Sequence, residues 1–155
     1  MYLLLKTLHI LSSTVLFGTG LGTAFFMWKV NRSGNRQAMA VVTGHVIKAD
    51  LYFTTPSIVL QPATGVALML MAGYPLEMLS PNWLGLSLWL YGVAGACWLP
   101  VLWLQYRMHQ LAVHDLANPE LPASYWRYER AWTCLGVPAF FSLVIVFWLM
   151  VAKPF

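Results

Sequence analysis

Four long stretches of this chain contain no Asp, Glu, Lys or Arg, and they restrict its fold more than any other feature. They run from Thr7 to Trp28, from Leu51 to Leu76, from Met78 to Tyr106 and from Ala131 to Ala152. A helix of about 20 apolar residues, rising about 1.5 Å per residue, crosses the hydrocarbon core of a bilayer, so each stretch is long enough to cross once. Hydrophobic residues make up 59% of the chain and charged residues 9%, which is typical of a membrane protein. We therefore predict an all-α bundle of four antiparallel transmembrane helices.

A single integral membrane domain, residues 1–155, is expected to account for the whole chain, because no stretch remains for a soluble domain and no internal repeat is visible. The predicted helices span about 2–28, 38–72, 83–109 and 129–152. Pro56 and Pro62 each remove a backbone donor inside the second span, so we expect that helix to be kinked. The first helix continues through Trp28 into a basic loop, which favours a retained span over a cleaved signal peptide.

Positive charges in the loops predict the orientation. Basic residues gather in the first and third loops: Lys29, Arg32, Arg36, Arg107, Arg127 and Arg130. The second loop carries only Glu77. Because Lys and Arg are enriched in cytoplasmic loops, we expect both termini on the outer, or periplasmic, side of the cytoplasmic membrane. This topology explains most of the formal net charge of +4, so we attribute the basic balance to the anionic lipid of the bilayer and not to nucleic acid.

An ionisable pair opens the first predicted span. Lys6 and His9 are three residues apart, and no other ionisable side chain follows before Lys29. Removing such groups from water is costly, so each is by default a functional-site hypothesis. Histidine is a ligand for haem iron and for copper. We expect His9 to bind one of these metals, with Lys6 as a second ligand or as the partner of a haem propionate.

The depth of His9 limits its partners. It lies about 28 Å from Trp28 at about 1.5 Å per residue, which places it in the outer half of the bilayer, away from His45 and His109. At its level the other helices offer three methionines as second ligand: Met69, Met71 and Met150. His45 and His109 both belong to the inner boundary, where they form either an alternative ligand pair or two solvated side chains.

Small and polar residues in the first two helices are candidates for the wall of a cofactor site. Gly18 and Gly22 are four residues apart, a spacing that lets another helix approach closely or leaves room for a flat macrocycle. The residues expected to form a bent wall in the second span are Thr54, Thr55, Pro56 and Gln61.

Several other chemistries find no support in the sequence. There is no P-loop, Gly-rich dinucleotide fingerprint, H-E-x-x-H or C-x-x-C motif, and no Ser-His-Asp arrangement. Cys97 and Cys134 lie inside predicted spans, where we expect them to be small packing residues. Asp50 is the only acidic residue near a span interior, so the paired carboxylates of a proton-coupled transporter are missing.

Four segments resemble a family of small bacterial integral membrane proteins of unknown function. They are residues 5–10 (LKTLHI), 51–56 (LYFTTP), 61–65 (QPATG) and 105–108 (QYRM). More distantly, the K-x-x-H opening and the LYFTTP element resemble HemJ-type protoporphyrinogen oxidases, which are haem-containing four-helix proteins. This resemblance implies that His9 is a haem ligand, although the lysine of their third helix has no counterpart between Trp83 and Gln105. The overall plan also resembles the CopD copper-resistance membrane proteins, which implies copper handling by histidine and methionine.

Three functions are compatible with these observations. The first is a membrane protein that binds b-type haem through His9 and takes part in redox or haem-related chemistry. The second is a copper or small-molecule transport or resistance protein, whose path follows the polar positions of the second helix. The third is a non-catalytic accessory subunit of a larger membrane complex, with no cofactor required. A homodimer through Gly18 and Gly22 is compatible with each of them.

Overall fold

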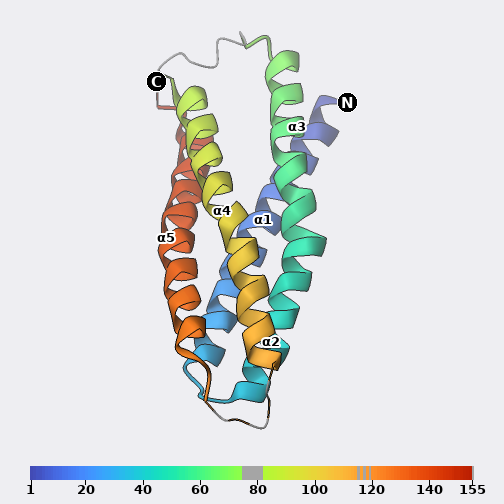
Figure 1. Ribbon diagram of the computed structural model, residues 1–155. Coiled ribbons are helices and arrows are strands. Elements are labelled where there is room, and N and C mark those ends of the chain that lie inside the picture. The colour runs from blue at the N-terminus through green and yellow to red at the C-terminus, as the bar shows by residue number, and fades with distance from the viewer. Residues whose placement is uncertain (75–81, 115, 117, 119, 155) are drawn as a thin grey trace.

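The computed structural model describes residues 1–74, 82–114, 116, 118 and 120–154, and these form helices and no strand (Figure 1). The elements are α1 (Tyr2–Asn31), α2 (Arg36–Ala49), the π-helical segment η1 (Asp50–Thr54), α3 (Thr55–Met71), α4 (Trp83–Val113) and α5 (Ala123–Ala152). Because α2, η1 and α3 follow one another without a break, four helical units are long and apolar enough to cross a membrane. The predicted all-α bundle of four spans is confirmed. The loop residues Glu77 and Pro119 lie outside the described residues.

Two helices begin at asparagine caps. The side-chain oxygen of Asn35 accepts a hydrogen bond from the backbone N–H of Ala38, and that of Asn82 accepts one from Gly85. Such caps satisfy one of the free N–H groups of a first helical turn. They set the start of α2 at Arg36, slightly ahead of the expected residue 38, and the start of α4 at Trp83.

The last helix starts earlier than its polar residues suggest. α5 begins at Ala123, directly after the extended Pro122, and not near Glu129. Its first turns look like loop in the sequence because they carry charges. They are held in place by Tyr125, which is fully buried and donates a 2.7 Å hydrogen bond to Asn31 Oδ1 at the end of α1. The expected ends of the first and third helices are likewise extended, to Asn31 and Val113.

Near Pro56, where the sequence predicts a kink, the second span contains the π-helical segment η1. Pro56 is the second residue of α3 and has no N–H to donate, which disturbs the regular helical pattern. In the wider turn, the carbonyl of Asp50 accepts from the backbone N–H of Thr55 and, at 2.9 Å, from its hydroxyl. The α-helix resumes at Thr55 and continues through Pro62.

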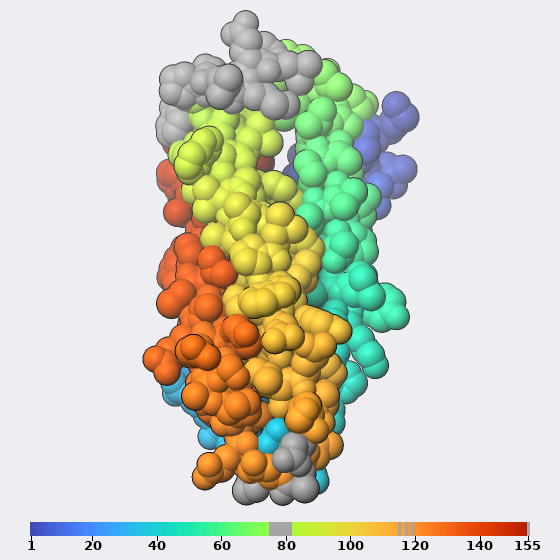
Figure 2. All heavy atoms as spheres, viewed as in Figure 1, coloured from blue at the N-terminus to red at the C-terminus, as the bar shows by residue number. Residues whose placement is uncertain are grey.

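The bundle is closed at one end and looser at the other. We call the end with the loops 32–35 and 114–122 the loop face, and the end with both chain termini the termini face (Figure 1). α4 packs along α5, α1 packs along α3, and α2 joins the two pairs at the loop face by contacting α1 and α4. The core cluster at this face consists of Met27, Ala40, Val46, Met108, Ala112 and Tyr125. Toward the termini face α3 and α4 make few contacts, and the space-filling view shows a hollow between them (Figure 2).

Large apolar side chains cover the outside of the bundle. Examples with more than half of their surface exposed are Phe26, Val59, Trp89, Phe141 and Val151. In water such a surface would promote aggregation, whereas in a bilayer it is solvated by lipid. The exterior is therefore consistent with a chain that crosses the membrane four times.

Candidate functional site

His9 is tethered between α1 and α3. Its Nδ1 lies 2.8 Å from the hydroxyl oxygen of Thr64, and the side-chain amide of Gln61 donates a 2.9 Å hydrogen bond to the His9 backbone carbonyl. Thr64 and Gln61 are buried, while His9 itself is half-buried. The two hydrogen bonds fix the depth and the rotation of this segment of α1 against α3.

The hydroxyl of Thr64 determines the tautomer of His9. A hydroxyl group has one proton, and Thr64 donates it to the carbonyl of Leu60 at 2.6 Å. The hydroxyl therefore accepts the hydrogen bond from Nδ1–H. In the neutral imidazole this proton position leaves the lone pair on Nε2, and no hydrogen bond of Nε2 is found among the described residues.

Gly65 provides the space that the His9 ring occupies. A Cβ atom at this position would lie 3.3 Å from Cε1 of His9, which is closer than ordinary van der Waals contact. The Thr64-Gly65 pair therefore acts as a seat for the imidazole: the threonine orients the ring and the glycine admits it. We call this arrangement the His9 seat.

The other residues predicted for the His9 site lie at different distances from it. Gln61 contacts the His9 backbone as described, and Lys6 is exposed about one helical turn nearer the termini face. Thr64 and Gly65 lie at the same level as His9. The candidate second ligand Met69, which is buried, lies about one helical turn closer to the termini face. Met71 is exposed and Met150 is half-buried, and no contact with His9 is found for either among the described residues.

Thr54, Thr55 and Pro56 do not approach the His9 seat. They lie at η1 and the start of α3, about 15 Å closer to the loop face at about 1.5 Å per residue. Among the described residues Gly18 and Gly22 pack against no other helix, since a Cβ atom at either position would meet nothing within 4 Å. The glycine spacing was expected either to let another helix approach or to leave room for a macrocycle. Close approach of another described helix of this chain is not found at these two positions.

A buried polar cluster in the middle of the bundle centres on Asp50. Asp50 is 4% exposed, its carboxyl group accepts a 2.7 Å hydrogen bond from the Thr54 hydroxyl, and the side chain of Gln105 on α4 lies beside it. Gln105 is 2% exposed, and its Oε1 has no partner. π-helical turns occur frequently at functional sites, and a carboxyl group at this depth is costly to bury. Both residues were noted in the sequence, Asp50 as an acidic residue near a span and Gln105 in the QYRM segment, but nothing there indicated that they lie together.

A second tethered histidine lies near the loop face. Nδ1 of His109 on α4 is 2.9 Å from the hydroxyl oxygen of Thr43, which itself donates to the carbonyl of Met39 at 2.8 Å. As at His9, the hydroxyl accepts from Nδ1–H, and Nε2 keeps its lone pair. Gly44 admits the ring, because a Cβ atom there would lie 3.1 Å from Cε1 of His109. We call this arrangement the His109 seat.

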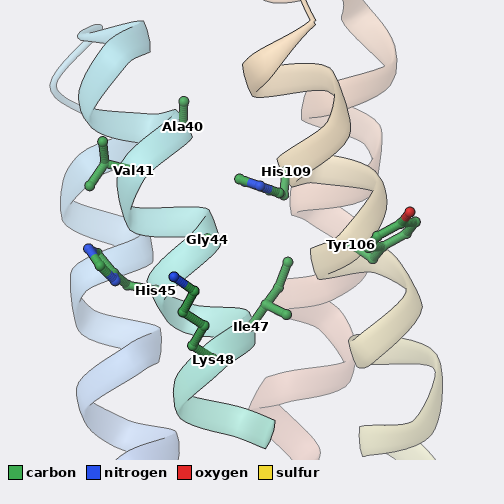
Figure 3. A pocket seen from close by; sticks show the side chains of 8 residues that line it. All are labelled: Ala40, Val41, Gly44, His45, Ile47, Lys48, Tyr106 and His109. Carbon is green, nitrogen blue, oxygen red and sulfur yellow. The ribbon is translucent and has the colours of Figure 1, made fainter.

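The predicted pairing of His45 with His109 is not formed. Both histidines line a groove of about 420 Å³ between α2 and α4. His109 extends from α4 toward Gly44, whereas His45 is exposed and points away from α4 (Figure 3). The two positions lie at the same depth, but they project from α2 and α4 in directions that do not converge.

Side chains able to hold a bare metal ion do not converge in the part of the chain that the structure describes. No group of three or more His, Cys, Asp or Glu residues is found there. Cys97 and Cys134 are free thiols, and Cys134 is exposed on α5.

Comparisons with known proteins show the family and no more. No curated protein and no solved structure matches the chain. A family model described as "Predicted integral membrane protein (DUF2269)" matches residues 3–154, and the chain therefore belongs to this family of integral membrane proteins.

Proposed function

We propose that this protein binds b-type haem in the membrane through Nε2 of His9 and takes part in electron transfer or haem-related chemistry. The observation that carries the proposal is the hydrogen bond from Nδ1–H of His9 to Thr64, which leaves the Nε2 lone pair available. Histidines that bind metals almost always donate their other ring N–H to a fixed acceptor in this way. A bound haem would supply a reversible one-electron couple.

The donor count favours haem over a bare copper ion. A porphyrin brings four nitrogen ligands of its own and needs only one or two from the protein. A bare ion needs several converging protein ligands, and no group of three or more His, Cys, Asp or Glu residues is found among the described residues. Of the three candidate methionines, Met69 is nearest in depth to His9 and could complete a copper site with it. It lies about one helical turn away along α3.

Lys6 supports a haem at this position. It is exposed one turn closer to the termini face than His9, where a long side chain can keep its ammonium group near the headgroups. An ammonium group at that level can pair with a haem propionate while the macrocycle stays in the apolar region. The resemblance of the K-x-x-H opening to haem-containing HemJ-type proteins points the same way.

The loop charges and two glycines of α1 support a proposal for the orientation of the protein in the membrane and for its contacts with other chains. The bilayer is the cytoplasmic membrane, with the basic loop face in the cytoplasm and both termini outside. Gly18 and Gly22, which pack against no other helix among the described residues, form the part of α1 offered to a second copy or to a subunit of a larger complex.

Optical spectroscopy of the detergent-purified protein tests the proposal. The wild type, produced with ample haem, is expected to show a Soret band that is weakened in His9→Ala by the loss of the haem bound to His9. The matched control is His114→Ala, because His114 is exposed in the turn after α4, far from the seat, and should leave the band unchanged. Colourless wild-type protein, or a full Soret band in His9→Ala, would contradict the proposal. Copper recovered in stoichiometric amounts from colourless protein would favour the copper-handling alternative.

A further inference from the structure

The His9 seat and the His109 seat have the same construction. In each, a Thr-Gly dipeptide of the second span faces a histidine from a different helix. The threonine donates to the carbonyl four residues earlier and accepts from Nδ1–H, and the glycine lies against Cε1 of the ring. Both imidazoles are therefore held as the tautomer with a free Nε2 lone pair.

The two seats lie near opposite faces of the membrane. Thr43 and Thr64 are 21 residues apart in one continuous helical span (64 − 43), which corresponds to roughly 30 Å along the helix axis at about 1.5 Å per residue. They are too far apart to act on one ligand, so a ligand at the His109 seat would be separate from the one at His9.

The groove beside the His109 seat has room for a ligand. It measures about 420 Å³, within the range of about 300–1,000 Å³ common for small-molecule sites, and it lies between α2 and α4 (Figure 3). Its lining is mainly apolar, and Lys48 contributes the one ammonium group. A flat apolar molecule with an acidic edge matches this combination of an apolar wall, a lone-pair nitrogen and a single cation.

We propose that the His109 seat binds a second haem, with Nε2 of His109 on the iron and Lys48 beside a propionate. This inference rests on the proposed function, because the identity of the ligand is taken from the His9 seat, while the geometry of the second seat is independent. The molecule would then carry one haem near each face.

Haem stoichiometry tests the second seat. Haem extracted from purified protein is quantified against protein by amino-acid analysis, and circular dichroism and gel filtration check the fold of each variant. We expect about two haems per chain in the wild type and in His114→Ala, and about one in each of His109→Ala and His9→Ala. Lys48→Ala should keep the second haem but release it more readily to a haem-scavenging protein.

The outcomes separate the two proposals. One haem per wild-type chain that is retained in full by His109→Ala would overturn the second seat and leave the His9 proposal standing. One haem that is lost in His109→Ala but retained in His9→Ala would overturn the His9 proposal. Colourless wild-type protein would overturn both. Because the wild-type ratio needs no variant, a His109→Ala variant that fails to fold still leaves a test: about two haems per chain support the two seats, and one haem per chain contradicts a haem at both.

Discussion

Arg36 is the single residue that does most to organise the loop face. It is 7% exposed, and its guanidinium donates to four backbone carbonyls: those of Asn118 at 2.6 Å, Glu120 at 2.7 Å, Leu111 at 3.2 Å and Ala112 at 3.4 Å. The last two belong to the final turn of α4, whose carbonyl groups have no partner inside the helix. The positive charge also lies at the negative end of that helix dipole. A residue that looked like an ordinary loop charge is thus a structural cap.

Replacing Arg36 by alanine is expected to destabilise the protein by about 2–4 kcal/mol, because it leaves several buried carbonyls without a donor. Arg36→Lys should recover only part of this loss, since an ammonium group cannot reach four acceptors as a planar guanidinium does. Denaturant titration in mixed micelles measures both. The control is Arg107→Ala, an exposed side chain that among the described residues is hydrogen-bonded to Gln110, and for which we expect a change of about 0.5 kcal/mol or less. Equal losses at both positions would contradict the capping role.

Sequence reasoning at this scale identified charges but not their partners. His9 stood out because an ionisable group inside an apolar run is rare. Its partner Thr64 did not, because threonines are common in membrane helices and the pairing depends on how α1 is rotated against α3. The Thr-Gly dipeptides at 43–44 and 64–65 were the available signal for both seats, and they become meaningful only once each is seen facing a histidine.

Among the elements, η1 joins the second span to α4. Asp50 and Gln105 are buried partners from two helices, and Thr54 adds a hydrogen bond from within η1. In a medium without water, buried polar groups depend on one another for hydrogen bonding, so the loss of one leaves the other unsatisfied. The cluster therefore fixes the position of the second span relative to α4 along the bundle axis.

A double-mutant cycle tests this lock. Asp50→Leu and Gln105→Leu are each expected to lower the free energy of unfolding by about 1–3 kcal/mol, since each strands a buried polar partner. The double variant should lose less than the sum, with a coupling of about 0.5–2 kcal/mol. Strictly additive losses would show that the two side chains do not depend on each other.

The spans themselves were predictable, whereas their details were not. The length of the four stretches without charged residues predicted four membrane crossings, and Pro56 predicted a kink in the second span. The sequence could not show that the irregularity is a π-helical turn, because that depends on how the Asp50 carbonyl is shared with Thr55. The early start of α5 was missed because the burial of Tyr125 depends on Asn31, more than ninety residues away in the chain.

At the scale of the whole molecule, a tight loop face and a looser termini face give the bundle a polarity. The loop face contains the core cluster around Met27 and Met108 and the Arg36 cap. The His9 seat lies toward the looser end, where α3 and α4 separate. This arrangement leaves room for adjustment around His9 while the opposite end stays fixed.

The charge distribution predicts that the loop face is cytoplasmic. Single cysteines introduced as Ser33→Cys and Lys153→Cys, in a background with Cys97 and Cys134 replaced by alanine, report the two faces. A membrane-impermeant maleimide should label the variant at position 153 in intact cells and the variant at position 33 only after permeabilisation. The reverse pattern would contradict the proposed orientation.

Ligand replacement at His9 tests the central claim most directly. In His9→Gly the imidazole ring is removed and leaves space at the seat, so external imidazole can take its place on the iron. We expect His9→Gly to be purified without the Soret band of the His9 haem, and added imidazole together with haem to restore a Soret band that stays with the protein on gel filtration. His9→Gly that binds haem like the wild type, or a wild-type protein that takes up no haem at all, would contradict the account.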